Sequence, residues 1–345
     1  MGNVSIVEND MWNVTTGIYV DSANVTVEKN TVYLWGWVSY PRGIYSSSST
    51  TMIGNNTLDV IDKNPGWTEV NGIRGTWKLA YNNSVKSYVY GFRVDSSTNP
   101  TIRQNHIEGN SAGVRLWGSG VSPLVENNTF VDNVVGVLVQ GASSPTILNN
   151  TFSSSGYLSA GIKVEYGTPV IEGNEIYSIG QMGIWITSGG NPEISLNTIS
   201  YNDYGIRVAG GNATIHNSNT IHHNDYGIYI DTSLGAQIDH NTIENNNDYG
   251  IYIYSANLTY LNISWNDIEN NTDGSGVDYG IYGAIAPSPY WSCKCNWWGN
   301  NTGPNDTNPG PPYQNDGDGD RVSNYVDYVN WTRVVGGSRV CDGAP

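Results

Sequence analysis

Residues 219–253 read NTIHHNDYGIYIDTSLGAQIDHNTIENNNDYGIYI, and one pattern occurs twice within this stretch. It consists of Asn-Thr-Ile, a short polar turn that ends in Asp-Tyr-Gly, and then Ile-Tyr-Ile. Related segments recur on both sides, at intervals of 22 to 25 residues. The recurring asparagines are Asn105, Asn128, Asn150, Asn174, Asn197, Asn219, Asn241 and Asn266. A fixed period of this length is typical of a solenoid, in which each repeat forms one coil.

The segments inside each period alternate apolar with polar or aromatic residues, which predicts strands rather than helices. Stacked asparagines one coil apart can hydrogen-bond to each other and to the turn backbone. A glycine before each apolar segment allows a tight bend. These glycines are Gly17, Gly43, Gly72, Gly91, Gly113, Gly136, Gly161, Gly183, Gly205, Gly227, Gly250 and Gly280. We therefore predict an all-β chain, folded as one single-stranded parallel β-helix of about twelve coils.

The repeats resemble right-handed parallel β-helix repeats of the pectate-lyase-like and NosD-like carbohydrate-binding and sugar-hydrolase families. Asn-Trp-Trp-Gly at 296–299, followed by Gly303-Pro304, resembles the closing segment of secreted archaeal and bacterial members. The resemblance implies a right-handed helix over residues 1–292 and a C-terminal cap over residues 293–345. It also implies a polysaccharide ligand, although this fold carries many activities.

The composition limits the partners. The chain has 345 residues and a net charge of −16, which argues against nucleic acids and anionic membranes as partners. No apolar run is long enough to cross a bilayer. Fourteen Asn-x-Ser/Thr sequons, from Asn3 to Asn330, favour an extracellular or cell-surface glycoprotein. No signal peptide is evident at the N-terminus, so we expect that one has been removed.

Basic and aromatic residues gather at the outward position two residues after each glycine. Five of the 15 Lys and Arg residues lie at these twelve positions. Neighbouring coils repeat at about 4.8 Å, which is comparable with the length of one sugar unit. Aromatic faces stack on sugar rings, and Arg forks bind carboxylates or sulfates. The column and its neighbour therefore predict a track for a polysaccharide, and the basic residues favour an anionic one. Its substrate-binding residues are Arg93, Trp117, Trp185, Arg207, Tyr229, Asp231 and Tyr252.

Catalysis on this track stays open. The resemblance implies β-elimination by an Arg or Lys base, for which Lys163 and Arg115 are candidates, with Glu165 as a partner. The alternative is a structural face, on which Arg residues pair with acids and lie on aromatic rings. Strand-like residues begin at Val4, so the first coil is uncovered. A structural surface protein or filament that self-associates end to end is the rival function, unless the chain is a fragment.

Two features mark the C-terminal segment. Asp316, Asp318, Asp320 and Asp327 occupy positions 1, 3, 5 and 12 of an EF-hand-like loop, which predicts a structural calcium site. Arg321 stands where such loops carry Gly, and Asp327 stands where they carry Glu. We expect one disulfide from Cys341 to either Cys293 or Cys295, which leaves one thiol over.

Overall fold

The computed structural model describes residues 4–21, 23–34, 40–61, 69–95, 99–156, 158–231, 235–255, 261–272, 279–285, 291–306, 317–323, 326–328, 330–335 and 338–341. Every regular element within these ranges is a β-strand, which confirms the predicted all-β class. The chain divides into two compact units, unit 1 (Met1–Glu175) and unit 2 (Ile176–Pro345).

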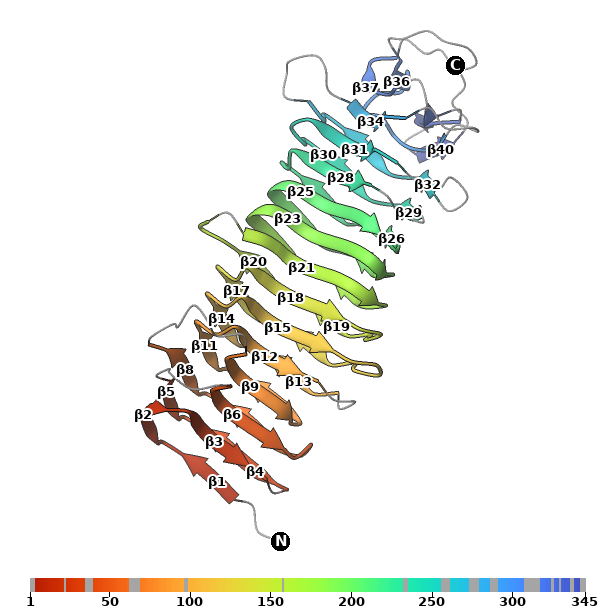
Figure 1. The fold of residues 1–345 in the computed structure, drawn as a ribbon. Coiled ribbons are helices and arrows are strands. Elements are labelled where there is room, and N and C mark those ends of the chain that lie inside the picture. Colours follow the sequence, from red (N-terminus) through yellow and green to blue (C-terminus); the bar gives the residue numbers. More distant parts are fainter. Residues whose placement is uncertain are drawn as a thin grey trace. The chain divides into compact units, whose positions relative to one another are not determined.

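Unit 1 is a stack of coils, each made of three strands that run parallel to those of the next coil (Figure 1). The first strands are β1 (Val4–Val7), β4 (Val25–Glu28), β7 (Met52–Gly54), β10 (Leu79–Tyr81), β13 (Thr101–Arg103), β16 (Leu124–Glu126), β19 (Thr146–Leu148) and β22 (Val170–Glu172). The second strands are β2 (Asp10–Val14), β5 (Thr31–Leu34), β8 (Thr57–Val60), β11 (Ser84–Lys86), β14 (His106–Glu108), β17 (Thr129–Val131) and β20 (Thr151–Ser153). The third strands are β3 (Thr16–Val20), β6 (Arg42–Ser47), β9 (Asn71–Thr76), β12 (Tyr90–Val94), β15 (Ala112–Trp117), β18 (Val135–Gln140) and β21 (Leu158–Gly167).

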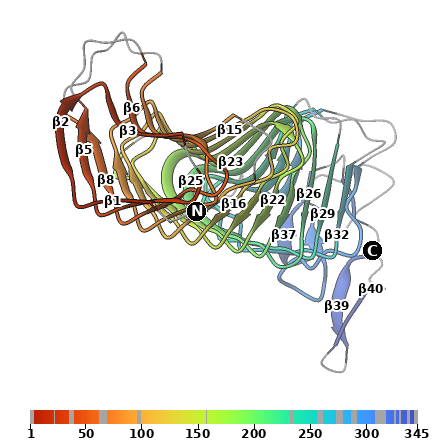
Figure 2. The same ribbon diagram turned by 90° about the horizontal axis from the view of Figure 1, so that it is seen from below.

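The three kinds of strand enclose a narrow apolar interior. Figure 2 shows β1 and β16 on one side of unit 1, β2, β5 and β8 on another, and β3, β6 and β15 on the third. Successive coils are in register, so that Val114 pairs with Phe92 and with Val137, and all three are fully buried. The rings of Phe130 and Phe152 stack with their centroids 4.5 Å apart. Each such side chain contributes roughly 1.5–3 kcal/mol by leaving water, which makes the interior the main source of stability.

The asparagine ladder closes the corner between the first and second strands. The side-chain Oδ1 of Asn128 accepts hydrogen bonds from the backbone N and the Nδ2 of Asn105, at 3.0 and 2.9 Å. Asn150 does the same for Asn128, at 2.9 Å for both bonds. The residue before each of these asparagines has a positive φ, for example 53° at Asn127 and 52° at Asn149. A left-handed residue followed by a buried Asn is thus the turn unit, and the predicted ladder is confirmed.

A second turn precedes the third strand and is stabilised by the same kind of hydrogen bonds between stacked asparagines. The Oδ1 of Asn133 accepts from the N and Nδ2 of Asn110, at 3.1 and 2.8 Å. The glycine of the repeat follows, and a Cβ on Gly113 would lie 2.7 Å from the carbonyl oxygen of Gly136. The glycine is therefore required because the backbones of adjacent coils approach closely at this bend.

Unit 2 repeats the architecture. Its first strands are β24 (Glu193–Ser195), β26 (Asn212–His216), β29 (Gly235–Asp239) and β32 (Leu261–Ser264). The long strands β23 (Glu175–Gly190), whose first residue belongs to unit 1, and β25 (Thr198–Gly210) each span a second and a third position. The remaining second strands are β27 (Thr220–His222), β30 (Thr242–Glu244) and β33 (Asp267–Glu269), and the remaining third strands are β28 (Tyr226–Ile230), β31 (Tyr249–Ile253) and β34 (Tyr279–Gly283). With eight first strands in unit 1 and four in unit 2, the described residues come close to the expected twelve coils.

Both ladders of unit 2 end in the C-terminal segment. The Oδ1 of Asn296 accepts from the N and Nδ2 of Asn266, at 2.9 and 3.0 Å, and so closes the first ladder. At the second corner, Asn271 donates to a carboxylate instead, that of Asp320. Trp298 is fully buried, and the backbone of Trp297 pairs with Asp267 of the last coil.

Short strands complete the C-terminal segment of unit 2. Three pairs are formed by β35 (Trp291–Ser292) with β38 (Val326–Asp327), β36 (Pro304–Asn305) with β37 (Gly319–Arg321), and β39 (Thr332–Val335) with β40 (Ser338–Cys341). The last of these pairs is antiparallel, unlike the strand pairs of the coils. The predicted division into coils over residues 1–292 and a cap over 293–345 stays a prediction.

Candidate functional site

The outward column on the third strands of unit 1 is built as expected. Pairing in register places Tyr19 beside Tyr45, Tyr45 beside Arg74, and Arg74 beside Arg93. The same register continues from Arg93 through Arg115 and Leu138 to Lys163. Because side chains alternate along a strand, each of these residues faces away from the interior, and its neighbours in sequence are buried except for Gly75.

Arg93 belongs to a dense group of ion pairs within this column. Its Nη1 lies 2.8 Å from Glu69 Oε2, and its Nε lies 2.7 Å from Asp95 Oδ1. Arg74 approaches the same two acids, with Nη2 at 3.2 Å from Asp95 Oδ2 and Nη1 at 3.5 Å from Glu69 Oε2. Burial lowers the pKa of Arg93, but the hydrogen bonds to Asp95 and Glu69 raise it overall. The Arg93 side chain is only 4% exposed, so Arg93 supports the face and is not the sugar contact that we expected.

The three residues expected to catalyse lie in one connected cluster. Arg115 Nε donates to Gln140 Oε1 at 2.8 Å, and Gln140 Nε2 donates to Glu165 Oε2 at 2.7 Å. Lys163 Nζ lies 2.9 Å from the other carboxylate oxygen of Glu165. The structure therefore joins Arg115 to the Lys163–Glu165 pair through Gln140, a residue that the sequence did not single out.

Aromatic rings complete this cluster. The Arg115 guanidinium lies 4.7 Å from the ring centroid of Tyr90 and 4.8 Å from that of Trp117. Trp117 is 47% exposed, so its ring presents apolar surface to solvent beside the cation. Arg115, Trp117, Gln140, Lys163 and Glu165 are called the Arg115 cluster from here on.

Glu165 carries the negative charge of the Arg115 cluster. Burial raises the pKa of Glu165, but hydrogen bonds from Gln140 and Lys163 outweigh it, and the pKa is lowered. Glu165 is therefore ionised at neutral pH, and its carboxylate is held between Gln140 and Lys163.

Unit 2 carries two rows of stacked tyrosines on its third strands. The inner row precedes each glycine and comprises Tyr204, Tyr226, Tyr249 and Tyr279. The outer row comprises Tyr229, Tyr252 and Tyr282, with centroids 5.0 and 5.4 Å apart. Burial raises the pKa of Tyr226 and of Tyr229 to about 12, so the phenols stay protonated at neutral pH.

This stacking changes the role expected for Tyr229 and Tyr252. The planes of their rings are nearly parallel, at 7°, and the rings cover each other's faces. Tyr229 also packs under the guanidinium of Arg207, 5.5 Å from its centroid, and Arg207 Nη2 pairs with Asp231 Oδ2 at 3.1 Å. A sugar ring stacks on an open aromatic face, and these faces are occupied. Tyr229, Tyr252, Arg207 and Asp231 therefore pack against one another in a column, and Trp185 is a half-buried residue of β23. Their role in sugar binding stays a prediction.

A family model described as "right handed beta helix region" matches residues 1–152 and 135–284. The chain belongs to the right-handed β-helix family. The fold of this β-helix protein is also similar to that of the A-module of mannuronan C-5 epimerase AlgE6 from Azotobacter vinelandii. That likeness has a TM-score of 0.57 at 16% sequence identity and covers 83% of this chain and 92% of the other. No curated protein sequence matches the chain. Among the described residues, no helix has the length and apolar character needed to span a membrane.

The acidic residues expected to bind calcium are only partly described in this β-helix protein. Asp316 lies outside the described residues. The carboxylate of Asp320 accepts a hydrogen bond from Asn271 at the end of the second ladder, and Asp327 forms an ion pair with Lys294 at 3.3 Å. Within the part of the chain that the structure describes, no three His, Cys, Asp or Glu residues form a metal-binding group. The calcium site stays a prediction.

Of the two disulfide pairings expected for Cys341, the structure shows the one with Cys295. Cys295 and Cys341 form the disulfide, with Cα atoms 5.0 Å apart. Cys293 is the remaining thiol and is buried, and both burial and the nearby Asp327 raise its pKa. Cys293 is therefore an inert interior residue at neutral pH.

Several residues of the site were not predicted from the sequence. Tyr90 and the inner tyrosine row share the position before the glycine, which was assigned only to a turn. Glu69 lies before β9 and carries no repeat signal. The Asp-Tyr-Gly that recurs in four successive repeats was the one available indication, because a Tyr at the same place in adjacent coils stacks on its own copies.

Proposed function

We propose that this β-helix protein is an extracellular polysaccharide-binding protein, and that the Arg115 cluster in unit 1 is where an acidic polysaccharide binds. The observation that carries the proposal is the pairing of Arg115 with the half-exposed ring of Trp117. An exposed aromatic ring beside a cation can stack on a sugar and hold its carboxylate at once. Coils in register at about 4.8 Å offer neighbouring positions for successive sugar units.

The structural neighbour suggests the first polymer to test. Its name states that it acts on mannuronan. At 16% identity the likeness concerns the fold, so mannuronan serves here only as a first representative of acidic polysaccharides. A neutral glucan of similar length is its counterpart without carboxylates.

Affinity electrophoresis in gels that contain mannuronan or the neutral glucan tests the proposal. We expect mannuronan to retard the protein, and both Trp117→Ala and Arg115→Gln to weaken this retardation about tenfold or more, because a hydrogen bond to a charged group is lost in the latter. Trp12→Ala and Arg103→Gln are the matched controls. Trp12 is 57% exposed on a different strand, and Arg103 is exposed on β13. Equal retardation of the Arg115→Gln and Arg103→Gln variants would refute the proposed site.

Cleavage of the polymer is a second candidate function, favoured by the placement of Lys163, Glu165 and Arg115 in one cluster. β-Elimination would transfer the proton on the carbon next to the carboxylate to Lys163. The C4–C5 double bond forms as the glycosidic C4–O bond breaks, the departing oxygen takes up a proton, and an unsaturated sugar is left at the new chain end. Ultraviolet absorbance of that product separates the two functions. A steady increase that Lys163→Ala abolishes, with retardation retained, would establish a lyase. Retardation without any increase leaves a binding protein.

A structural protein that assembles end to end is the third alternative. It predicts neither retardation nor turnover with any polymer, together with a concentration-dependent mass in light scattering.

A further inference from the structure

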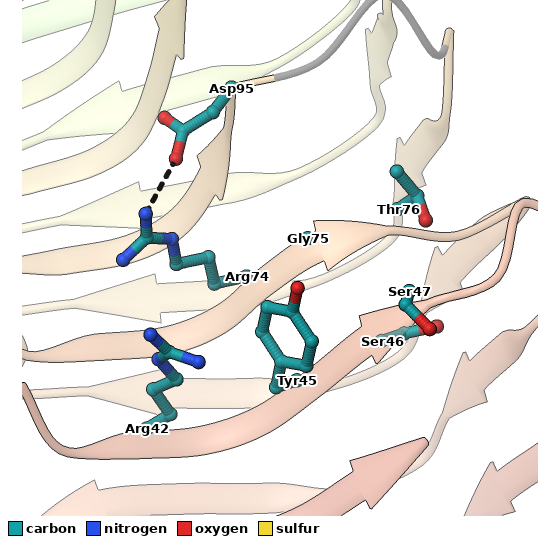
Figure 3. A pocket seen from close by; sticks show the side chains of 8 residues that line it. All are labelled: Arg42, Tyr45, Ser46, Ser47, Arg74, Gly75, Thr76 and Asp95. Carbon is teal, nitrogen blue, oxygen red and sulfur yellow. Dashed lines mark ion pairs between the residues drawn. The ribbon is translucent and has the colours of Figure 1, made fainter. Parts of the chain in front are cut away.

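A separate pocket lies on the third-strand face of unit 1, closer to the N-terminus than the Arg115 cluster. It has a volume of about 280 Å³. Strands β6 and β9 supply most of its lining, and Asp95 closes one side (Figure 3). The lining residues are Arg42, Tyr45, Ser46, Ser47, Arg74, Gly75, Thr76 and Asp95.

Arg42 is the residue that points to a ligand. Within the described part of the chain, no carboxylate lies within ion-pair distance of its guanidinium, and its buried Nε has no hydrogen-bond partner. Its recorded contact is with the ring of Tyr45, whose centroid lies 4.8 Å from the guanidinium carbon. A buried N–H of a charged group costs free energy when it lacks a partner. The Nε is enclosed by the protein, so a ligand would reach this cation through its terminal nitrogens, which are not enclosed.

The acids around the pocket are engaged by partners other than Arg42. Arg74 and Arg93 share the carboxylates of Glu69 and Asp95, two cations against two anions. Asp21 lies beside the pocket, and its carboxylate accepts from the Oγ of the lining residue Ser47 at 2.5 Å. The six side chains are neutral in sum, but Arg42 has no ion pair with a described acid, so its charge favours one negative group of a ligand.

The other walls indicate what that ligand carries besides its negative charge. The Oγ1 of Thr76 is enclosed at this wall and has no hydrogen-bond partner, so it becomes available to a ligand when the Thr76 side chain changes rotamer. Asp95 offers carboxylate lone pairs that accept from hydroxyl groups. A bare inorganic anion would use neither feature and would face the Asp95 charge. A ligand with a carboxylate for Arg42 and hydroxyls for Thr76 and Asp95 satisfies all three.

We infer that this pocket binds a single uronic-acid unit, with the sugar carboxylate on Arg42 and sugar hydroxyls on Thr76 and Asp95. The volume suits one sugar ring rather than an extended oligomer. Arg42 is held against Tyr45 before any ligand arrives, which lowers the entropy lost on binding. The inference deepens the proposed function, on which it rests for the class of sugar, because it adds an anchoring subsite on the same face of unit 1.

Gly75 shows why the pocket stays open. Its φ is +112°, and a Cβ at this position would lie 2.0 Å from the carbonyl oxygen of Ser46. A side chain is therefore excluded between Arg74 and Thr76, and the floor of the pocket remains bare. This residue is unsuitable for substitution, because any larger side chain would disturb β9 against β6.

Isothermal titration calorimetry tests the inference with four probes: a uronic-acid trisaccharide, its methyl ester, a neutral trisaccharide and inorganic sulfate. We expect the acid to bind, and the methyl ester and the neutral sugar to bind at least tenfold more weakly, because only the acid supplies a charge for Arg42. Arg42→Gln should weaken binding of the acid at least tenfold, and Arg42→Lys should restore part of it. Thr76→Val, which keeps the shape, should weaken binding severalfold, whereas Arg103→Gln should leave it unchanged.

Four results would overturn the inference. They are the absence of heat with the acid, equal binding of acid and methyl ester, an Arg42→Gln variant that binds like Arg103→Gln, and sulfate binding as tight as that of the acid. Far-ultraviolet circular dichroism of each variant confirms that the β-structure is intact. The two proposals fail separately. Mannuronan retardation that depends on Arg115 but not on Arg42 refutes the pocket alone, and acid binding that depends on Arg42 without retardation refutes the Arg115 cluster alone.

Discussion

The carboxylate of Asp320 accepts hydrogen bonds from both the backbone N and the Nδ2 of Asn271, at 3.0 and 2.8 Å through Oδ2. In every preceding coil of unit 2 from Asn202 onward, an Asn Oδ1 fills this place. The other oxygen of Asp320 accepts from the backbone N of Asn270 at 2.8 Å. Asp320 therefore ends the second ladder with a group that only accepts.

This arrangement predicts a pH-dependent stability. Burial raises the pKa of Asp320 from 3.8 to about 6, against the opposing hydrogen bonds from Asn271 and Asn270. The folded protein then holds the Asp320 proton more tightly than the unfolded chain. By linkage, the contribution of this group to stability is fully present below about pH 4 and is lost as the pH rises through about 6. Its size is at most about 3 kcal/mol.

Urea unfolding of wild type and Asp320→Asn between pH 4.5 and 7.5 measures this contribution. We expect the free energy of unfolding of the wild type, relative to the variant, to increase as the pH falls. Taking the difference between wild type and variant cancels the contributions of the other carboxylates to the pH dependence. Ion-paired carboxylates lose stability as the pH falls, which is the opposite of the effect expected for Asp320. A difference that does not vary with pH would show that Asp320 does not titrate in this range.

Substitution of Asn128 tests how much the first asparagine ladder contributes to the free energy of unfolding. Its Nδ2 donates to Asn150 Oδ1 and to the carbonyl of Ile102, both at 2.9 Å, while its Oδ1 accepts twice from Asn105. Asn128→Ala leaves these buried partners without bonds, at about 1–3 kcal/mol each. We expect a loss of at least about 3 kcal/mol in chemical unfolding. Asn127→Gly is the neighbouring control: Asn127 is exposed with a φ of 53°, a conformation that Gly adopts readily, and equal losses in the two variants would contradict the prediction.

The turn geometry makes a prediction about the sequons. Asn127 and Asn149 are both sequon acceptors, both exposed, and both at the left-handed turn position of consecutive coils. Neighbouring strands lie about 4.8 Å apart, so two glycans cannot be accommodated side by side. In a secreting, glycosylating host we expect molecules that carry a glycan on one of the two. Mass spectrometry of peptides spanning both sites detects this, and Asn127→Gln should increase occupancy at Asn149. A fully double-modified peptide would be inconsistent with the crowding.

The Cys295–Cys341 disulfide predicts a locally stabilised C-terminal tail. It closes a loop with a sequence separation of 46, for which the chain-entropy model gives about 4 kcal/mol. Cys341→Ser should increase hydrogen exchange and proteolysis in β39 and β40, with the coils unaffected. Cys293 is buried, so iodoacetamide should modify it only after denaturation. Labelling of Cys293 in the native protein, or global loss of structure in Cys341→Ser, would be the contrary outcome.

Calcium binding at Asp316, Asp318, Asp320 and Asp327 can be tested together with the pH effect. Both oxygens of Asp320 accept hydrogen bonds within the ladder, so a calcium ion that uses this residue must draw it away. If calcium binds there, the melting temperature should increase with calcium, and the pH dependence attributed to Asp320 should disappear. Asp318→Asn should abolish the increase, whereas Asp59→Asn, on β8, should not. No response to calcium would leave Asp320 as a ladder residue only.

The repeat spacing was sufficient to predict the strands, which of their residues face the interior and which face outward, and the asparagine ladder. The reason is that stacking identical positions at a fixed period satisfies the same hydrogen bonds in every coil. The register of the third strands then placed Arg74, Arg93 and Arg115 in one column without further information.

Which of these cations is accessible could not be predicted in the same way. Arg93 and Arg115 occupy equivalent positions, yet Arg93 is buried by Glu69, an acid that precedes β9. Arg42 was not predicted because it precedes its glycine, whereas the predicted column lies two residues after each glycine. Glu69 lies outside the repeated pattern, and Arg42 lies on the other side of the glycine bend from the predicted column. Contacts made by such residues do not recur with the period of the repeat.

The ladder bonds all run in one direction, since within each unit an Asn donates its N–H and Nδ2 to the following coil. A polypeptide emerging from the ribosome therefore completes each coil only when the next one arrives. At any length of the nascent chain, the most recently formed coil has a backbone N–H and an Asn Nδ2 at each ladder that still lack their acceptors. The second ladder of unit 2 ends when the carboxylate of Asp320, which only accepts hydrogen bonds, binds to Asn271.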